Sequence, residues 1–405
     1  MAHSHDNVSA GDLSLPPQLR RILVASIGAF MVATVVGLVV LWPPATATGQ
    51  PAPELGTPVQ LVNAKVTAST LVPCGSTLPG PNLVCRSVTV KLDQGPEKGT
   101  TTVLDITDSP DQPTLRVGDR VILGRSADPT GVAYYFSDYQ RRTPLLALGL
   151  LFAVAVIGLA RWRGAAALAG LVISLVVLVR FALPAILAGE NALAVAIVAA
   201  AVIAVLIVYL AHGVTTRTTT ALLGTLVSLA LTAVLAVIFV HAAHLTGLSS
   251  EEDTYLRGIL GGRVNLQGLL LGGIVIGTLG VLNDVTVTQA SAVWEIYLAN
   301  PAVDARRLYL SAMRIGRDHI ASTVDTLVLA YAGAALPLLV IFTIAGRRLG
   351  DVLTGEIVAE QLVQTLVGSL GLVASVPVTT ALAVLLVTRS VRRRPRGAPG
   401  LAPEG

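Results

Sequence analysis

Long, nearly uncharged apolar runs recur along the chain, and they constrain its fold more than any other feature. Each run is close to the ~20 residues that a transmembrane helix needs and much longer than the ~9–11-residue strands of a membrane barrel. Charged residues make up only 13% of the sequence, about half the share found in soluble proteins. The sequence therefore predicts a polytopic α-helical membrane protein with about eight transmembrane helices. The runs occupy residues 22–42, 144–160, 165–188, 192–211, 219–243, 264–284, 320–345 and 363–388.

One extended polar stretch, residues 43–142, does not follow this pattern. It opens with several prolines, which form a stiff tether, and continues with short alternating segments separated by Gly and Pro turns. We therefore expect a small β-rich domain, either a barrel or a sandwich. Cys74 and Cys85 both lie in it, and such a closely spaced pair outside the membrane is expected to form a disulfide. The alternating segments are 59–67, 87–92, 101–107 and 120–123.

The distribution of arginine predicts the topology. Arginines gather at alternate ends of successive runs, whereas the other ends carry acidic residues such as the Glu251–Asp253 cluster. Arg141, Arg142, Arg347 and Arg348 depart from this bias. The positive-inside rule then places both termini in the cytoplasm and the β-rich domain outside, where a disulfide persists. The predicted order is a cytoplasmic tail (1–21), an anchor helix (22–42), an extracytoplasmic β-domain with its tether (43–142), a seven-helix transmembrane domain (143–388) and a basic cytoplasmic tail (389–405).

Two alternatives concern the chain ends and the net charge. Ala45-Thr46-Ala47 resembles a signal-peptidase site, so the first run is either an uncleaved anchor, which its length favours, or a cleaved signal peptide. The net charge of +4 does not indicate a nucleic-acid partner, because the arginines lie at the ends of apolar runs. The lipid bilayer is the partner that the composition implies.

Polar side chains break the apolar pattern in two neighbouring segments. Asp284, Thr288, Ser291 and Glu295 follow helical spacing and share one face, and the same holds for a second segment around Asp318. An ionisable residue in the bilayer costs about 2.5–3.5 kcal/mol, so it usually faces a partner or a wet cavity. We therefore predict an intramembrane polar site. Its candidate residues are Asn283, Asp284, Thr288, Gln289, Ser291, Glu295, Arg314, Arg317, Asp318, His319, Ser322 and Asp325.

The same residues allow a structural interpretation, in which Asp284 or Asp318 pairs with Arg314 or Arg317 and locks two helices together. Metal binding is left open, although Asp318 and His319 point about 100° apart on a helix. No dinucleotide-binding glycine motif, Walker loop or H-E-x-x-H is present, so we expect no cofactor.

Three stretches resemble the YibE/F-like family of bacterial membrane proteins. They are YFSDYQR at 135–141, GVLNDVTVTQASAVWE within 277–295, and GRDH at 316–319. With the order of the runs, the resemblance covers nearly all of 59–345. It implies a multi-pass protein of the bacterial inner membrane with an extracytoplasmic domain, and no settled activity. The family pattern has two consecutive aspartates where this chain has Asn283-Asp284, which leaves Asp284 as the carboxylate to test.

Three functions fit these features. The leading one is a transporter, or a component of a transport system, that moves a small solute or ion past the polar site. The second is a structural or sensing protein that acts through its outer β-domain. The third, which is less favoured, is an intramembrane enzyme with Asp284 and Asp325 as an acid/base pair. A partner subunit or a homo-oligomer fits any of them.

Overall fold

The computed structural model describes residues 13–14, 16–44, 60–74, 84–128, 131–249, 255, 258, 264–346 and 348–392. The predicted proline tether beyond residue 44, the Glu251–Asp253 cluster, the Ala45–Ala47 site, Arg347 and the tail beyond residue 392 lie outside these residues. The chain divides into two compact units. One, the β unit, comprises residues 51–158, and the other, the helical unit, comprises residues 1–50 and 159–405.

The β unit is a five-stranded antiparallel sheet that curls into a half-barrel. Its strand order is β4-β3-β2-β5-β6. Alternate side chains, such as Val62, Ala64 and Val66 on β2, are buried inside the curl, as the two-residue period of a strand requires. The strands are β2 (Gln60–Pro73), β3 (Val84–Leu92), β4 (Thr101–Thr107), β5 (Arg120–Asp128) and β6 (Gly131–Tyr139).

The sequence located four of these strands and missed the fifth. The aromatic residues of β6 are typical of a membrane-interface belt, but Tyr134, Phe136 and Tyr139 pack against the core of the half-barrel. The predicted disulfide between Cys74 and Cys85 is confirmed. It joins the end of β2 to the start of β3.

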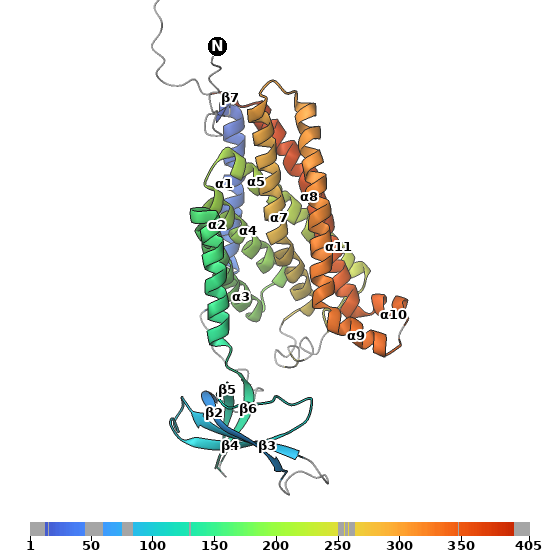
Figure 1. Cartoon of the computed structure of the whole chain (residues 1–405). Helices are drawn as coiled ribbons and strands as arrows, with labels where there is room; N and C mark the ends of the chain where they lie inside the picture. Colours follow the sequence, from blue (N-terminus) through green and yellow to red (C-terminus); the bar gives the residue numbers. More distant parts are fainter. Residues whose placement is uncertain are drawn as a thin grey trace, which may run out of the picture. The chain divides into compact units, whose positions relative to one another are not determined.

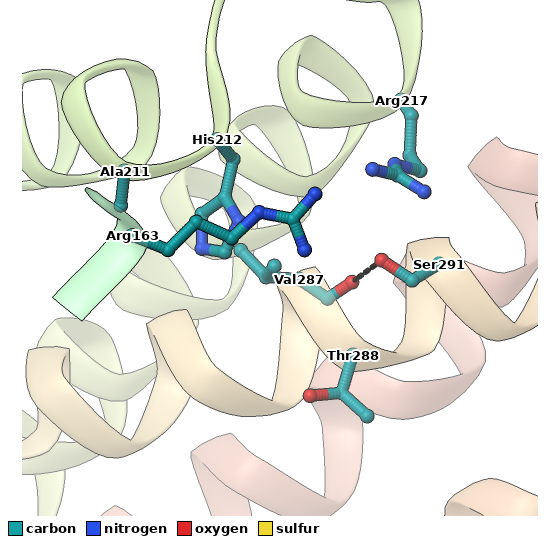
Figure 2. A pocket seen from close by; sticks show the side chains of 7 residues that line it. All are labelled: Arg163, Ala211, His212, Arg217, Val287, Thr288 and Ser291. Carbon is teal, nitrogen blue, oxygen red and sulfur yellow. Dashed lines mark hydrogen bonds between the residues drawn. The ribbon is translucent and has the colours of Figure 1, made fainter. Parts of the chain in front are cut away.

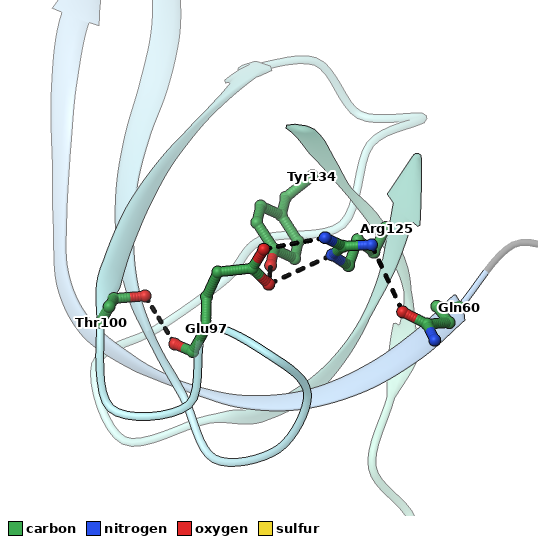
Figure 3. A network of polar contacts seen from close by, with 5 residues as sticks. All are labelled: Gln60, Glu97, Thr100, Arg125 and Tyr134. Atoms are coloured by element: carbon green, nitrogen blue, oxygen red, sulfur yellow. Dashed lines mark hydrogen bonds and ion pairs between the residues drawn. The ribbon is translucent and has the colours of Figure 1, made fainter. Parts of the chain in front are cut away.

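A network of charged and polar side chains connects segments of the β unit (Figure 3). The Arg125 guanidinium donates two hydrogen bonds to the Glu97 carboxylate, at 3.1 and 2.8 Å, and the Tyr134 hydroxyl donates a third at 2.6 Å. These donors favour the ionised form and lower the pKa of Glu97 to about 2. Arg125 also donates to Gln60 Oε1 at 3.4 Å.

The helical unit consists of long helices joined by short connections (Figure 1). A two-residue pairing of β1 (Leu13–Ser14) with β7 (Val391–Arg392) joins the two ends of its chain. The helices are α1 (Pro17–Val40), α2 (Arg142–Val177, which starts in the β unit), the π-helical turn η4 (Leu178–Ala182), α3 (Leu183–Leu187), α4 (Ala192–His212), α5 (Thr216–Ala242), α7 (Leu266–Ala299), α8 (Ala305–Ala334), α9 (Leu336–Ile344), α10 (Leu349–Thr354) and α11 (Glu356–Thr388).

Among the described residues, six helices are long and apolar enough to cross a membrane, or seven if the bent pair α8–α9 forms one span. The expected eight spans are therefore not confirmed. The difference arises at Arg142–Leu187, a 46-residue segment that counts as one helix although the sequence divides it into two runs. Arg161 within it has non-helical backbone angles (φ 52°, ψ −128°). The 57° bend between α8 and α9 lies just before Pro337, as expected where proline interrupts a helix.

The core of the helical unit lies where α5, α7 and α11 pack closely. Glycines permit the approach, because a Cβ at Gly224 would overlap Thr379 and one at Gly371 would overlap Thr232. Many of the buried hydroxyls in this core donate to a carbonyl of their own helix; Thr232, for example, donates to Ser228 O at 2.8 Å. The core is therefore rich in hydroxyls yet tightly packed.

The helical unit has two chemically different ends. At one end, Leu23 of α1, Trp294 of α7, Leu308 of α8 and Val387 of α11 form one cluster. We call this the arginine-rich end. The start of α5 packs here as well, through Leu223. The arginines nearest this end are Arg20, Arg21, Arg217, Arg306, Arg307 and Arg389, and Arg314 and Arg317 lie further along α8.

At the opposite end, Trp42 stacks on Phe181 with ring centroids 5.9 Å apart. Glu356 at the start of α11 accepts a hydrogen bond from Thr246 Oγ1 at 2.6 Å. This end carries the acidic residues Glu190, Asp351, Glu356 and Glu360. The helices α1, α4, α5, α7, α8 and α11 thus all run between a basic and an acidic end.

Candidate functional site

Helix α7 carries the first of the two predicted polar segments. It continues without a break from Leu266 to Ala299 and so extends well beyond the predicted span 264–284. The Asn265 side chain caps its start by accepting from Gly268 N at 3.1 Å. The polar stretch is therefore helical, as its spacing predicts, and its side chains point to different faces.

One of these side chains, Gln289, lies on the buried face of α7. It is 2% exposed. Its Nε2 donates to Ala312 O on α8 at 2.9 Å and to Thr380 Oγ1 on α11 at 2.7 Å. Gln289 therefore ties three helices together.

Asp284 lies on the exposed face of α7 and meets α8. Its Oδ2 is 3.7 Å from His319 Nε2. That nitrogen and the Oδ1 of the neighbouring Asn283 are both buried atoms without a hydrogen bond in the described part of the chain. Buried polar atoms normally have partners, and an orphaned one costs about 1–3 kcal/mol. The Asp284–His319 pair is thus a loosely satisfied contact between two titratable groups.

The remaining candidates are more dispersed. Glu295 lies 3.7 Å from Arg217 Nη1 of α5. Asp318 and Asp325 are exposed on α8, as are Ser322, Arg314 and Arg317. Among the described residues, Arg314 Nη2 contacts Ser311 Oγ alone, at 3.5 Å.

Two arrangements that the sequence left open do not form among the described residues. No ion pair joins Asp284 or Asp318 to Arg314 or Arg317 there, and no three His, Cys, Asp or Glu side chains come together as metal ligands. Asp325 follows His319 by six residues, which is about 120° around α8 and about 9 Å along it. It therefore does not face Asp284 as His319 does.

A pocket of about 400 Å³ opens beside the exposed face of α7, at the arginine-rich end (Figure 2). Val287, Thr288 and Ser291 of α7 line it, and Ser291 Oγ donates to Val287 O at 2.8 Å. The rest of its lining comes from three other segments: Arg163 of α2, Ala211 and His212 at the end of α4, and Arg217 at the start of α5.

Sequence reasoning included Thr288 and Ser291 but not the three basic residues of the pocket. The available signal was the clustering of Arg163 and Arg217 at the same ends of successive runs, which was interpreted only as topology. Nothing in the spacing showed that both approach α7.

Comparison with known proteins agrees with the resemblance. Residues 148–389, more than half of the chain, match the family described as YibE/F-like protein. The matched range includes the stretches 277–295 and 316–319 and begins after 135–141. No curated protein and no solved structure matches the chain.

Proposed function

The chain belongs to the YibE/F-like protein family, and we propose that it is an eight-span protein of the bacterial inner membrane that moves a small solute or ion past the Asp284–His319 pair. Several helices that could span a membrane support the multi-pass part of this proposal.

The direction of the chain supports the proposed eight spans. Trp42 lies at the acidic end of the helical unit and Arg163 at the arginine-rich end. The intervening chain must therefore cross between the two levels an odd number of times. Within the described part of that interval, residues 142–160 are the one apolar helix. Counting it with α1, the segment 162–187, α4, α5, α7, α8–α9 and α11 gives eight crossings.

The orientation follows from charge. Cytoplasmic loops carry an excess of arginine and lysine, so the arginine-rich end is proposed to face the cytoplasm. Both ends of the described chain meet there through β1 and β7. The β unit then follows α1 on the outer side, in a compartment that allows the Cys74–Cys85 disulfide.

The depth of Asp284 supports a functional site. Helix α4 has 21 residues, about 31 Å, which matches the hydrocarbon thickness. Its last residue, His212, lines the same pocket as Thr288, and Asp284 lies one turn, about 6 Å, further in along α7. A carboxylate at this depth needs a wet cavity or a partner.

The single observation that carries the transport proposal is the Asp284–His319 contact, with its carboxylate and its hydrogen-bond-free imidazole nitrogen. Two such groups can pass a proton between them or hold an ion transiently, because neither side chain has another hydrogen bond or ion pair among the described residues. The charged, exposed side chains of α8, such as Asp325, would be covered in the membrane by a second copy or a partner subunit.

The test is flux in proteoliposomes that contain the full-length protein, with protons, Na⁺, K⁺, Mg²⁺ and phosphate measured separately. Asp284→Asn and His319→Gln should each abolish the flux seen with the wild type while thermal stability stays within about 0.5 kcal/mol. Glu295→Gln, on the same helix but outside the pair, is the matched control and should retain flux. Equal flux in all four proteins would reject the proposal.

A further inference from the structure

We propose that the pocket between α2, α4, α5 and α7 is a binding site for a phosphate group, carried either by a membrane phospholipid or by a small soluble phosphate ester. This proposal is independent of transport, because it concerns equilibrium binding at the arginine-rich end and does not use the Asp284–His319 pair.

The two arginines of the pocket carry the proposal. Arg163 and Arg217 reach it from separate elements, His212 lies beside them, and none of its seven lining residues is acidic. Figure 2 shows both guanidinium groups directed toward the same space. Guanidinium groups bind phosphate through paired, charge-assisted hydrogen bonds, so two of them facing one space suit this ligand.

The two arginines have few existing partners, so their guanidinium groups remain largely free to bind a phosphate group. Within the described part of the chain, Arg163 makes no ion pair. Arg217 has one, to Glu295, at a loose 3.7 Å. The Glu295 side chain is 70% exposed and does not line the pocket. A phosphate group therefore need not displace a buried carboxylate.

The hydroxyls and the size of the pocket restrict which phosphate compounds can bind there. The Thr288 hydroxyl has no hydrogen-bond partner among the described residues and can donate to an anion, whereas Ser291 already donates to Val287 O. The volume of about 400 Å³ equals about a dozen water molecules. That is more than a bare phosphate fills, so we expect an ester with an organic part.

The depth of the pocket in the membrane favours a phospholipid as the source of the phosphate group. Helix α4 is about as long as the hydrocarbon layer is thick, and its final residue, His212, lines the pocket. The pocket therefore lies where phospholipid phosphates lie. Basic pockets between transmembrane helices on the cytoplasmic side are known to bind anionic headgroups.

The experiment uses the purified full-length protein in neutral detergent. Native mass spectrometry counts bound phosphatidylglycerol, with phosphatidylcholine as the neutral comparison lipid. Thermal unfolding with inorganic phosphate or glycerol phosphate, against chloride at equal ionic strength, tests the soluble source. The variants are Arg163→Gln and Arg217→Gln. Arg306→Gln, an exposed arginine at the same end but outside the pocket, is the matched control.

Each pocket variant should weaken binding about tenfold, the value of one lost charge-assisted contact, and Arg306→Gln should leave it unchanged. Selective loss of phosphatidylglycerol supports a lipid site, and selective loss of the phosphate-dependent thermal shift supports a soluble ester. If Arg217→Gln does not fold, binding is measured instead with Arg163→Gln and with Arg217→Lys, which keeps the positive charge, and these two variants test the proposal. Absence of binding in the wild type, or an equal loss in Arg306→Gln, would overturn the proposal.

Discussion

The two faces of α7 carry polar residues of the same kinds but use them in opposite ways. On the buried face, Gln289 donates two short hydrogen bonds to neighbouring helices. On the exposed face, Asp284 has a single partner at 3.7 Å, and Thr288 borders an open pocket. On the buried face, the polar side chain is therefore packed and held by short hydrogen bonds. On the exposed face, the polar side chains have long or few contacts and remain accessible.

This difference separates residues that hold the fold from residues that are available for a ligand. Polarity within an apolar helix does not by itself mark function, since a buried amide that donates hydrogen bonds to two neighbouring helices rigidifies the core. Unsatisfied atoms next to space are the better indicator. The predictions below test the distinction, in order of decreasing effect on stability.

Gly316→Leu should have the largest effect, because it fills the contact between α8 and the buried face of α7. A Cβ there would overlap Val376 and lie 2.9 Å from Gln289 Oε1. We expect a loss of about 3 kcal/mol, the upper end of overpacking costs, measured by unfolding in detergent. Gly333→Leu on the same helix has no atom within 4 Å of its Cβ and should not destabilise. An equal loss in both would contradict the assigned packing.

Gln289→Met should cost about 2 kcal/mol, because it keeps the volume and removes both hydrogen bonds. The neighbouring Thr288→Val, on the exposed face, should stay within about 0.5 kcal/mol. Thermal unfolding of the two variants measures the contrast between the faces directly. Similar losses of stability in both variants would show that the two faces contribute equally to the stability of the fold.

The Asp284–His319 pair should contribute little to stability. A double-mutant cycle with Asp284→Asn and His319→Gln should give a coupling energy below about 1 kcal/mol, as is usual for a loose ion pair. A coupling of about 3 kcal/mol, the cost of breaking a buried ion pair, would instead make the pair a structural clamp. The cycle thus decides between the two interpretations of these residues.

The β unit offers the smallest effect, because its charged network is only partly buried and water still reaches it. The pKa of Glu97 is lowered from 4.5 to about 2 by Arg125 and Tyr134. Since the folded state holds the carboxylate ionised, the contribution is complete above pH 4.5 and disappears as the pH falls through about 2. The stability advantage of the wild type over Glu97→Gln should shrink across this interval, measured by pepsin cleavage within residues 60–139 of the full chain.

Gln60→Ala is the control for that experiment. It removes the contact to Arg125 but keeps the Glu97 carboxylate, so the pH dependence should remain. An advantage that stays constant down to pH 2 would mean that the network does not favour the ionised form of Glu97.

Much of the fold was predictable, because apolar length and strand alternation are local properties of the sequence. Each predicted run overlaps a helix or a series of helices, with ends that differ by at most two residues where a run extends past its helix, and Pro337 marks the bend before α9. Strand β6 was missed because Tyr134, Tyr135 and Phe136 suit a membrane interface as well as a barrel core. The number of spans differs because the sequence divides Arg142–Leu187 into two runs around Arg161, whereas in the structure the segment counts as one helix despite the non-helical backbone angles of Arg161.

The candidate site was predictable only in part. Spacing placed Asp284, Thr288 and Ser291 on one face, because i, i+4 and i+7 positions coincide on any helix. The predicted site also included Gln289, although that residue faces the core. The basic residues of the pocket were missed because Arg163 and Arg217 come from segments distant in sequence, and their meeting at α7 depends on helix packing.

The disulfide of the β unit has a practical consequence. In the proposed orientation, Cys74 and Cys85 are oxidised only in molecules whose β unit has been exported, and they are the chain's two cysteines. A molecule inserted upside down would keep both thiols reduced and open to alkylating reagents. The ratio of alkylated to unreactive protein in intact cells therefore reports directly on the fidelity of membrane insertion, without an added tag.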